Sequence, residues 1–152
     1  MQATFLQAVV VFLAGILAGE EFIVRYGIHP ALRNLDDRAH VNARIALVLI
    51  LRFVVPSVMI PTLLAVVAML VFDGDGAGAT FRWAGAAAFG AYLLISFLVT
   101  GPLNAKVEKW QADNPPANWK DVVRRWQRID VLRSTAAIFA FLGFVIALAD
   151  SV

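Results

Sequence analysis

The sequence predicts an all-α integral membrane protein: a four-helix bundle formed by one domain, residues 1–152, with both termini on the same side of the membrane. Three observations predict this fold class. Of the 152 residues, 61% are hydrophobic and 16% are charged, too few charges to cover a soluble domain. Four apolar segments are each long enough to cross about 30 Å of hydrocarbon as a helix. The basic residues gather beside these segments, a pattern of membrane orientation and not of nucleic-acid binding.

The predicted spans cover about residues 4–28, 41–72, 81–100 and 129–148. The first has no basic stretch before its apolar run and continues past signal-peptide length, so we expect it to be retained. It is expected to stop at His29-Pro30, because proline disfavours helical geometry in the preceding residue. Pro56 and Pro61 predict a kink in the second span, with the freed carbonyls satisfied by neighbouring groups. The sequence DGDGAG at residues 73–78 ends this span in a loop.

The third span is expected to end at Gly101-Pro102. A basic amphipathic segment follows at residues 104–128. From about Trp119 this segment is expected to be helical and to continue into the fourth span.

The distribution of basic residues predicts the orientation. Of the 13 Lys and Arg residues, four lie between residues 25 and 44 and seven between residues 104 and 133. Both segments connect odd-numbered spans to even-numbered ones, so they lie on one side of the membrane. Basic connections remain in the cytoplasm. We therefore expect an inner or plasma membrane protein with cytoplasmic basic loops and both termini outside.

Three charged residues lie more than four residues from either end of a predicted span: Glu20, Glu21 and Arg52. A charge in the bilayer costs roughly 2.5–3.5 kcal/mol, so it usually faces a partner or a cavity. Glu20 lies about 12 Å, and Arg52 about 16 Å, from the same membrane side at 1.5 Å per residue. We therefore predict an ion pair between Arg52 and either glutamate, with the second acid left to hold a proton or to bind a ligand. The alternative is a purely structural salt bridge between helices.

Other polar residues are predicted to converge on this depth: Glu21, Arg25 and His29 at i, i+4, i+8; Asn104; and Trp126, Asp130 and Arg133 at i, i+4, i+7. Each also has a structural interpretation. Arg25 and Arg44 can extend to lipid headgroups, and Trp126 can belong to an interfacial aromatic belt. Asp130 and Arg133 can form a pair that stabilises the helix. The convergence of several helices on one depth favours a binding site.

Small residues predict close helix packing. Ala14 with Ala18, and Gly15 with Gly19, form two small-xxx-small pairs on the first helix. The third helix has a similar run at residues 85–91. These stripes are more typical of packing within the bundle than of a dimer interface.

Several chemistries are excluded or restricted by composition. The chain has no cysteine, which excludes disulfides and thiolate metal sites. It has no glycine-rich phosphate loop and no nucleophile elbow. Two histidines, His29 and His40, are too few for a three-histidine metal site, and we expect no metal or other cofactor. A mixed metal site of His29 with Glu20 or Glu21 stays open as a weaker alternative.

Short motifs in the chain resemble the anthrone oxygenase family: GILAGEEF at residues 15–22, HPAL at 29–32, GPLN at 101–104, and Arg125-Trp126 followed by Asp130 and Arg133. The resemblance implies a small four-helix membrane protein. It also implies chemistry, since fungal relatives oxidise anthrones to anthraquinones with molecular oxygen and no conventional cofactor. One departure is Asp130, where the family resemblance leads us to expect Asn or His. An ionised carboxylate accepts hydrogen bonds but cannot donate them.

The first functional hypothesis is an oxygenase for a lipophilic phenolic or anthrone-type substrate. Glu20 or Glu21 would be the base that removes a proton from an acidic carbon, while Arg52 and Asn104 would stabilise the enolate oxygen. The remaining polar residues of the cluster would bind the substrate: Arg25, His29, Trp126, Asp130 and Arg133.

Two other hypotheses follow from the same residues. One is a non-enzymatic bundle that serves as an accessory subunit of a larger membrane complex or carries protons or small ligands. The other is a haem- or metal-binding redox protein that depends on His29. In every case the expected partners are the lipid bilayer and a lipophilic small molecule, with a homo-oligomer or membrane complex possible and no nucleic acid.

Overall fold

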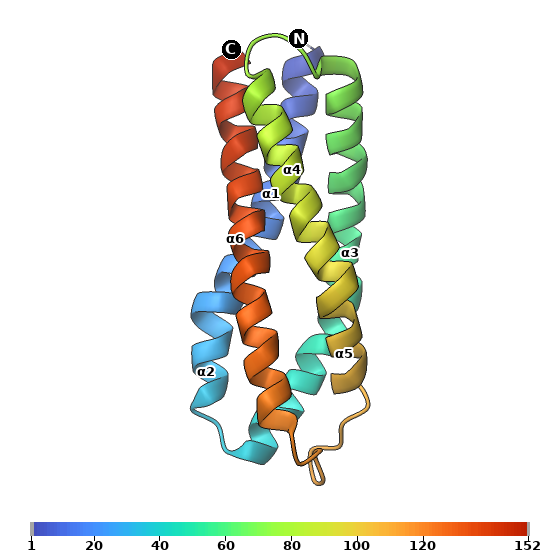
Figure 1. The fold of residues 1–152 in the computed structure, drawn as a ribbon, viewed down its shortest axis with the longest axis vertical. Helices are drawn as coiled ribbons and strands as arrows, with labels where there is room; N and C mark the ends of the chain where they lie inside the picture. Colours follow the sequence, from blue (N-terminus) through green and yellow to red (C-terminus); the bar gives the residue numbers. More distant parts are fainter. Residues whose placement is uncertain (1, 152) are drawn as a thin grey trace.

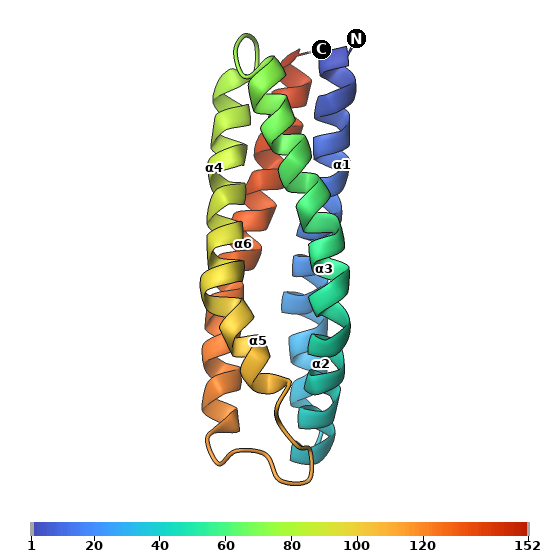
Figure 2. The ribbon, with the colours of Figure 1, turned by 90° about the vertical axis from the view of Figure 1, so that its right-hand side faces the viewer.

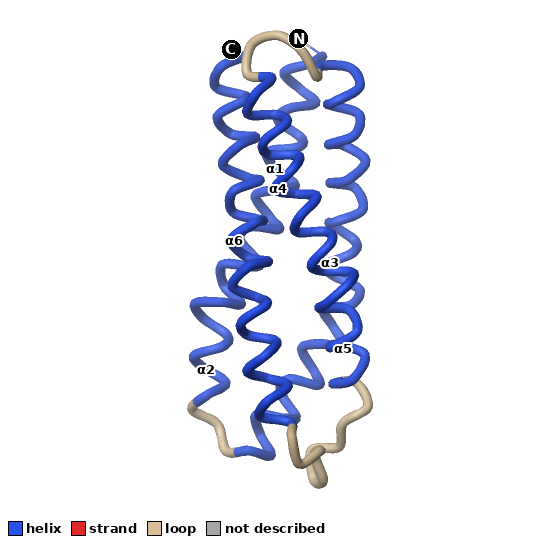
Figure 3. The backbone as a smooth tube through the Cα atoms, in the orientation of Figure 1, coloured by secondary structure: helices blue, strands red, loops and turns tan. Residues whose placement is uncertain are grey.

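The computed structural model describes residues 2–151 and is helical throughout that range, with loops but no strand (Figure 3). Four helices are long and apolar enough to cross a membrane: Thr4–Arg33, Asp37–Asp73, Ala79–Val107 and Trp119–Ser151. This confirms the predicted all-α membrane bundle. That the chain is one domain stays a prediction.

Two of the four long helices contain a wider, π-helical turn. The first consists of α1 (Gln2–Ile23), η1 (Val24–Ile28) and α2 (His29–Arg33), and the third of α4 (Ala79–Ile95), η2 (Ser96–Thr100) and α5 (Gly101–Val107). The second and fourth are α3 (Asp37–Asp73) and α6 (Trp119–Ser151). The first and third helices therefore extend past the proline positions where their ends were predicted.

The prolines account for the π turns. Pro30 has no N–H, and its ring would clash with the carbonyl of the residue four positions earlier in a regular α-helix. The chain widens before it: the His29 N–H bonds the Val24 carbonyl, five residues back. The Gly101 N–H before Pro102 bonds the Ser96 carbonyl in the same way. Each proline then occupies the first turn of the next α-helical piece, where its missing N–H costs little.

The predicted amphipathic segment at residues 104–128 is not one element. Its first residues belong to α5, residues 108–118 form a loop and turns, and α6 begins at Trp119. The prediction that helix begins near Trp119 and continues into the fourth span is confirmed.

The four helices run alternately up and down, and α1 begins where α6 ends (Figure 1). At that end, the Ser151 hydroxyl donates to Gln7 Oε1 at 2.8 Å. Helix α6 packs against α1 and α4, and α1 packs against α3. Helix α3 and the third helix have few contacts with each other (Figure 2). The bundle is therefore closed on three sides and looser on the fourth.

The half of the bundle that contains the termini is closely packed. Tyr92, Met69, Phe144 and Val10 are almost fully buried in its core. Helices α4 and α6 approach so closely that a Cβ added to Gly143 would lie 2.9 Å from the Cα of Gly85. This half has little room for a ligand.

The loop between α3 and α4 is held by polar contacts at the same end. Gly76 and Gly78 have positive φ angles of 90° and 74°, a conformation that favours glycine. The buried Arg82 guanidinium donates to the Asp75 carbonyl at 2.7 Å and lies 3.5 Å from the Asp73 carboxylate. Arg82, the basic residue predicted on this face, is thus part of the turn.

The bundle is longer than the hydrocarbon layer. Helix α3 has 37 residues, which is about 55 Å at 1.5 Å per residue, whereas the hydrocarbon core is about 30 Å thick. The end with α2, α5 and the long loop carries most of the charged side chains. We therefore infer that this end projects into headgroups and water, and that polar residues near its inner limit lie at the membrane boundary.

Candidate functional site

The half of the bundle away from the termini encloses a cavity of about 240 Å³ that is lined by all four long helices. Its walls are mostly apolar, with Val48, Leu51 and Met59 from α3. Its polar lining includes Glu20, His29, Arg44, Thr100, Asn104 and Trp126. Because Phe97 of η2 and Arg52 of α3 line the cavity and are also exposed, the cavity opens sideways between these two elements.

Both π turns contribute to the cavity wall. Val24 and Ile28 of η1 line it from one side, and Ser96, Phe97 and Thr100 of η2 line it from another. A π turn displaces the helix face that follows it, and such turns are frequent at functional sites. The two prolines thus set the positions of the residues around the cavity.

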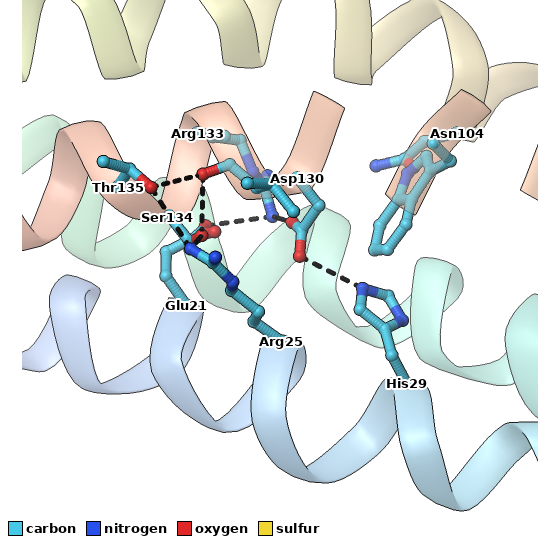
Figure 4. A network of polar contacts seen from close by, with 10 residues as sticks. Glu21, Arg25, His29, Asn104, Asp130, Arg133, Ser134 and Thr135 are labelled. Carbon is cyan, nitrogen blue, oxygen red and sulfur yellow. Dashed lines mark hydrogen bonds and ion pairs between the residues drawn. The ribbon is translucent and has the colours of Figure 1, made fainter. Parts of the chain in front are cut away.

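A buried network of charged side chains connects the first helix to α6 (Figure 4). Arg133 Nη2 lies 2.9 Å from Glu21 Oε1 and 3.1 Å from Asp130 Oδ1. Asp130 Oδ2 in turn lies 3.0 Å from His29 Nε2. All four residues are buried. The stripe predicted on the first helix therefore meets the face predicted on the fourth.

Arg25 faces a different part of the structure. Its Nη1 donates to the hydroxyls of Ser134 and Thr135, each at 3.2 Å (Figure 4). It lines a smaller hollow outside the main cavity together with His29 and Gln127. Arg25 thus fixes the first helix against α6 and does not line the main cavity.

The predicted ion pair of Arg52 with Glu20 or Glu21 is wrong. Arg52 Nη1 instead lies 3.0 Å from Glu108 Oε2, just after the end of α5. The depth estimate placed Arg52 and the glutamates at one level, but it carried no information about the direction in which each side chain leaves its helix. Glu21 faces α6, whereas Arg52 is partly exposed at the opening of the cavity.

Trp126 forms a fixed wall of the cavity. Its indole N–H donates to Asn104 Oδ1 at 3.0 Å. The His29 ring meets it edge to face, with centroids 4.8 Å apart, and the guanidinium of Arg44 lies 5.0 Å from its ring centre. Since Asn104 uses its oxygen for this bond, its amide NH₂ remains available to a ligand.

Glu20 differs from its neighbour Glu21. Like those of Glu21, its carboxylate oxygens are buried without a hydrogen-bond partner within residues 2–151, but Glu20 has no ion pair in this range, whereas Glu21 pairs with Arg133. Glu20 lines the cavity, which Glu21 does not. Of the two glutamates, the one without a cationic partner, as the sequence predicts for one of them, is therefore Glu20.

Comparison with known protein families identifies the family of this chain. The profile of the anthrone oxygenase family matches residues 46–143, more than half of the chain. The chain belongs to the anthrone oxygenase family. The suspected family is thereby confirmed, and the matched segment contains Arg52, Asn104, Trp126, Asp130 and Arg133.

The first-helix part of the site precedes the matched segment. Glu20, Glu21, Arg25 and His29 lie outside the match, and the structure joins Glu21 and His29 to Arg133 and Asp130 of the matched region. No curated protein and no solved structure matches the chain.

Two residues of the site, Arg44 and Glu108, are not among the site residues predicted from the sequence. Arg44 was interpreted as a residue that reaches lipid headgroups, yet it is buried and lines the cavity. Its four-residue spacing through Val48 to Arg52 indicates that all three share one face of α3. Glu108, the partner of Arg52, is the only acidic residue between positions 76 and 112, which could have identified it.

No group of three or more His, Cys, Asp or Glu side chains with an arrangement suited to a metal ion occurs in the described part of the chain. His29 directs Nε2 to Asp130 and not to Glu20 or Glu21. The alternative of a mixed site between His29 and a glutamate therefore gains no support from the geometry.

Proposed function

We propose that this protein is a membrane-embedded oxygenase that oxidises a lipophilic phenolic or anthrone-type substrate without a bound cofactor. One observation carries the proposal: an unpartnered carboxyl group, that of Glu20, lines an apolar cavity that opens sideways. A carboxylate in such surroundings is suited to remove a proton from a weakly acidic carbon.

The proposed reaction needs only the substrate and molecular oxygen. Glu20 removes a proton from the methylene carbon and leaves an enolate. The enolate transfers one electron to O₂, and the resulting radical and superoxide combine in a new C–O bond; the hydroperoxide anion takes up the proton from Glu20. Loss of water from this hydroperoxide gives the ketone. The carbon loses four electrons and O₂ gains four, with one oxygen atom in the product and one in water.

The other site residues have distinct proposed roles. The proposed role of Asn104, whose NH₂ is free and which lines the cavity, is to donate to the enolate oxygen as charge develops there. Trp126 provides a flat wall for the ring system. Arg133, Asp130 and His29 hold α6 against the first helix and so position Glu20 through its neighbour Glu21.

The His29–Asp130 pair offers a second candidate base. With its proton on Nε2, the His29 ring donates to Asp130 Oδ2, and Nδ1 has no partner among the described residues. A carboxylate that orients an imidazole is a common arrangement for a general base. The experiment below therefore includes a His29 variant.

The decisive measurement is oxygen consumption by the purified protein in nanodiscs with 1,8-dihydroxyanthrone, corrected for autoxidation in protein-free nanodiscs. Glu20→Gln should reduce the rate by roughly 10²–10⁴-fold, the usual contribution of a general base. Glu21→Gln and His29→Asn should retain more activity than Glu20→Gln. Asp113→Asn makes the same carboxyl-to-amide change at an exposed pair with Arg38 and should have no effect.

Two results would contradict the assignment. If Glu20→Gln retains the full rate while His29→Asn loses it, the base is His29. If the wild-type protein consumes no oxygen with any acidic phenolic substrate, the accessory-subunit or carrier function replaces the oxygenase.

A further inference from the structure

Arg44 is a buried cation without a counter-charge. Only 4% of the residue is exposed, and its Nε and Nη2 atoms have no hydrogen-bond partner within residues 2–151. The guanidinium of Arg44 makes a cation–π contact with the face of Trp126, 5.0 Å from the ring centre. A buried guanidinium left without acceptors is strongly destabilising. Because Arg44 lines the cavity, the missing acceptor is one that a ligand can supply.

The acidic groups around Arg44 are committed elsewhere or too far away. Asp130 already binds both Arg133 and His29, and Glu108 binds Arg52. Each of the other charged side chains that α3, α5 and α6 bring to the cavity therefore already has an oppositely charged partner.

Glu20 is too distant to neutralise Arg44. It lies nine residues before His29, whose ring contacts the same Trp126 that Arg44 covers. Nine residues correspond to roughly 13 Å along the helix. The cavity thus has an unpaired cation near one end and an unpaired carboxyl group near the other.

An unpaired cation near one end of the cavity and an unpaired carboxyl group near the other indicate the chemical class of its ligand. A guanidinium binds planar oxyanions such as carboxylate through two parallel hydrogen bonds. Trp126 and the apolar residues of α3 favour a flat, apolar body next to that group. Such a body would extend from Arg44 towards Glu20.

We infer that the cavity binds an aromatic oxyanion, a fused-ring carboxylate or phenolate, with its charged oxygen on Arg44 and its ring along Trp126. The inference rests on the proposed function for the presence of a substrate in this cavity, and it adds a requirement for negative charge on that substrate. A phospholipid phosphate offers Arg44 the same chemistry, so the test separates the two sources.

The test compares anthracene-2-carboxylate with its uncharged methyl ester. Binding is measured by energy transfer from tryptophan to the probe in phosphatidylcholine nanodiscs, with protein-free nanodiscs to subtract partition into lipid. The wild type should bind the acid roughly ten-fold or more tightly than the ester, as expected for charge-assisted hydrogen bonds.

Variants assign the difference to Arg44. Arg44→Gln should reduce the ratio of acid to ester affinity to about one and leave ester binding in place. Arg44→Lys should keep part of the preference for the acid, because lysine retains the positive charge but lacks the two parallel N–H donors of the guanidinium. Arg38→Gln, a matched change at an exposed arginine paired with Asp113, should keep the full preference.

The inference is overturned if the wild type binds acid and ester equally, or if Arg44→Gln keeps the preference. It is also overturned if nanodiscs containing phosphatidylglycerol abolish acid binding, since Arg44 would then serve lipid phosphate. Should Arg44→Gln not fold, the wild-type comparison and Arg44→Lys still decide. Oxygen consumption is measured separately. If the protein oxidises a neutral anthrone but binds acid and ester equally, only this inference is refuted. If it prefers the acid but oxidises no substrate, only the oxygenase function is refuted.

Discussion

The guanidinium of Arg133 contacts two buried carboxylates at once, those of Glu21 and Asp130. Its contact with Glu21 is an ion pair without hydrogen-bond alignment, so the attraction is mainly Coulombic. Since both acids are buried, they depend on Arg133 as their counter-charge. A buried ion pair adds little net stability, but removal of one member leaves a charge without compensation.

We therefore predict that Arg133→Ala destabilises the protein by about 3–5 kcal/mol in detergent. The free energy of unfolding is measured by chemical denaturation. Adding Glu21→Gln to the Arg133 variant should recover part of the loss, because the pair is coupled. Arg124→Ala removes an exposed pair with Asp121 and should cost about 1 kcal/mol at most. Equal effects of the two arginine variants would contradict the prediction.

A second residue-level prediction concerns Arg52. A double-mutant cycle of Arg52→Ala and Glu108→Ala should show a coupling energy, because their side chains are 3.0 Å apart. The cycle of Arg52→Ala with Glu21→Gln should be additive, since Glu21 faces Arg133 instead. Coupling in the second cycle and additivity in the first would restore the pairing that the sequence suggested.

At the scale of single residues, spacing in the sequence predicts which side chains share a helix face, but not which neighbouring helix that face meets. The four- and seven-residue spacings placed Glu21 and His29 on one helix face and Asp130 and Arg133 on another, and the structure brings these faces together. Depth alone could not distinguish Arg52 from Arg133 as the partner of Glu21. The two arginines lie at nearly the same number of residues from the starts of their helices, Asp37 and Trp119, and only the packing order of the helices decides which one faces the first helix.

The two π turns are the features of individual helices that matter most for the site. In a continuous α-helix, Glu21 and His29 would keep a fixed angular relation set by 3.6 residues per turn. The turn at Val24–Ile28 lies between them and changes that relation. Both residues can therefore bind α6 at the observed distances.

We predict that Pro30→Ala separates stability from function. An alanine restores the N–H and removes the ring that would clash with the carbonyl four residues earlier, so η1 can become regular α-helix. The free energy of unfolding should stay the same or rise, whereas oxygen consumption should fall as His29 turns away from Asp130. Pro115→Ala, in the loop before α6, should change neither quantity. Lower stability with unchanged activity would argue against a positioning role for the turn.

The contact between α4 and α6 gives another element-level prediction. Gly143→Ala should destabilise the bundle by about 1–3 kcal/mol, because its Cβ would meet the backbone of Gly85 at 2.9 Å. Gly90→Ala is the matched control on α4, since a Cβ there meets nothing within 4 Å. It should be neutral or stabilising by up to about 1 kcal/mol. Thermal unfolding in detergent ranks the two, and the reverse order would show that this contact can open.

Small-residue spacing alone did not separate packing glycines from others. It correctly drew attention to Gly85, which faces α6, and to Gly15, which faces Phe141. Gly19 and Gly90 share the same spacing but have no neighbour in the space their Cβ would occupy. The partner position, Gly143, also has a small residue four positions later, Ala147, but only the packed structure shows that Gly143 meets Gly85.

For the molecule as a whole, hydropathy was sufficient to identify four long helices, because lipid requires backbone groups to be satisfied within each helix. It could not show that the first and third helices continue past their prolines, since a π turn before a proline has no distinct hydropathy signal. It also could not show that α3 and the third helix separate enough to open a cavity. Those properties depend on packing among all four helices.

The predicted orientation is testable because the chain has no cysteine. Single cysteines at Gly76 and Gln111 should label from opposite sides of the membrane with an impermeant maleimide. The loop that contains Gln111 is expected on the cytoplasmic side, where the basic residues gather. Labelling of both positions from one side would refute the span assignment, and labelling of Gln111 from outside would reverse the orientation.

Under the proposed function, a cavity that opens sideways between α3 and η2 takes its substrate from the lipid phase, so its occupancy depends on the mole fraction of ligand in the bilayer and hardly on the aqueous concentration. With fixed amounts of protein and ligand, added phospholipid dilutes the ligand in two dimensions and lowers both occupancy and turnover. Affinities measured at different lipid-to-protein ratios become comparable only when expressed per mole of lipid. A ligand with modest intrinsic affinity can still saturate such a site, because partition into the membrane concentrates it beside the opening.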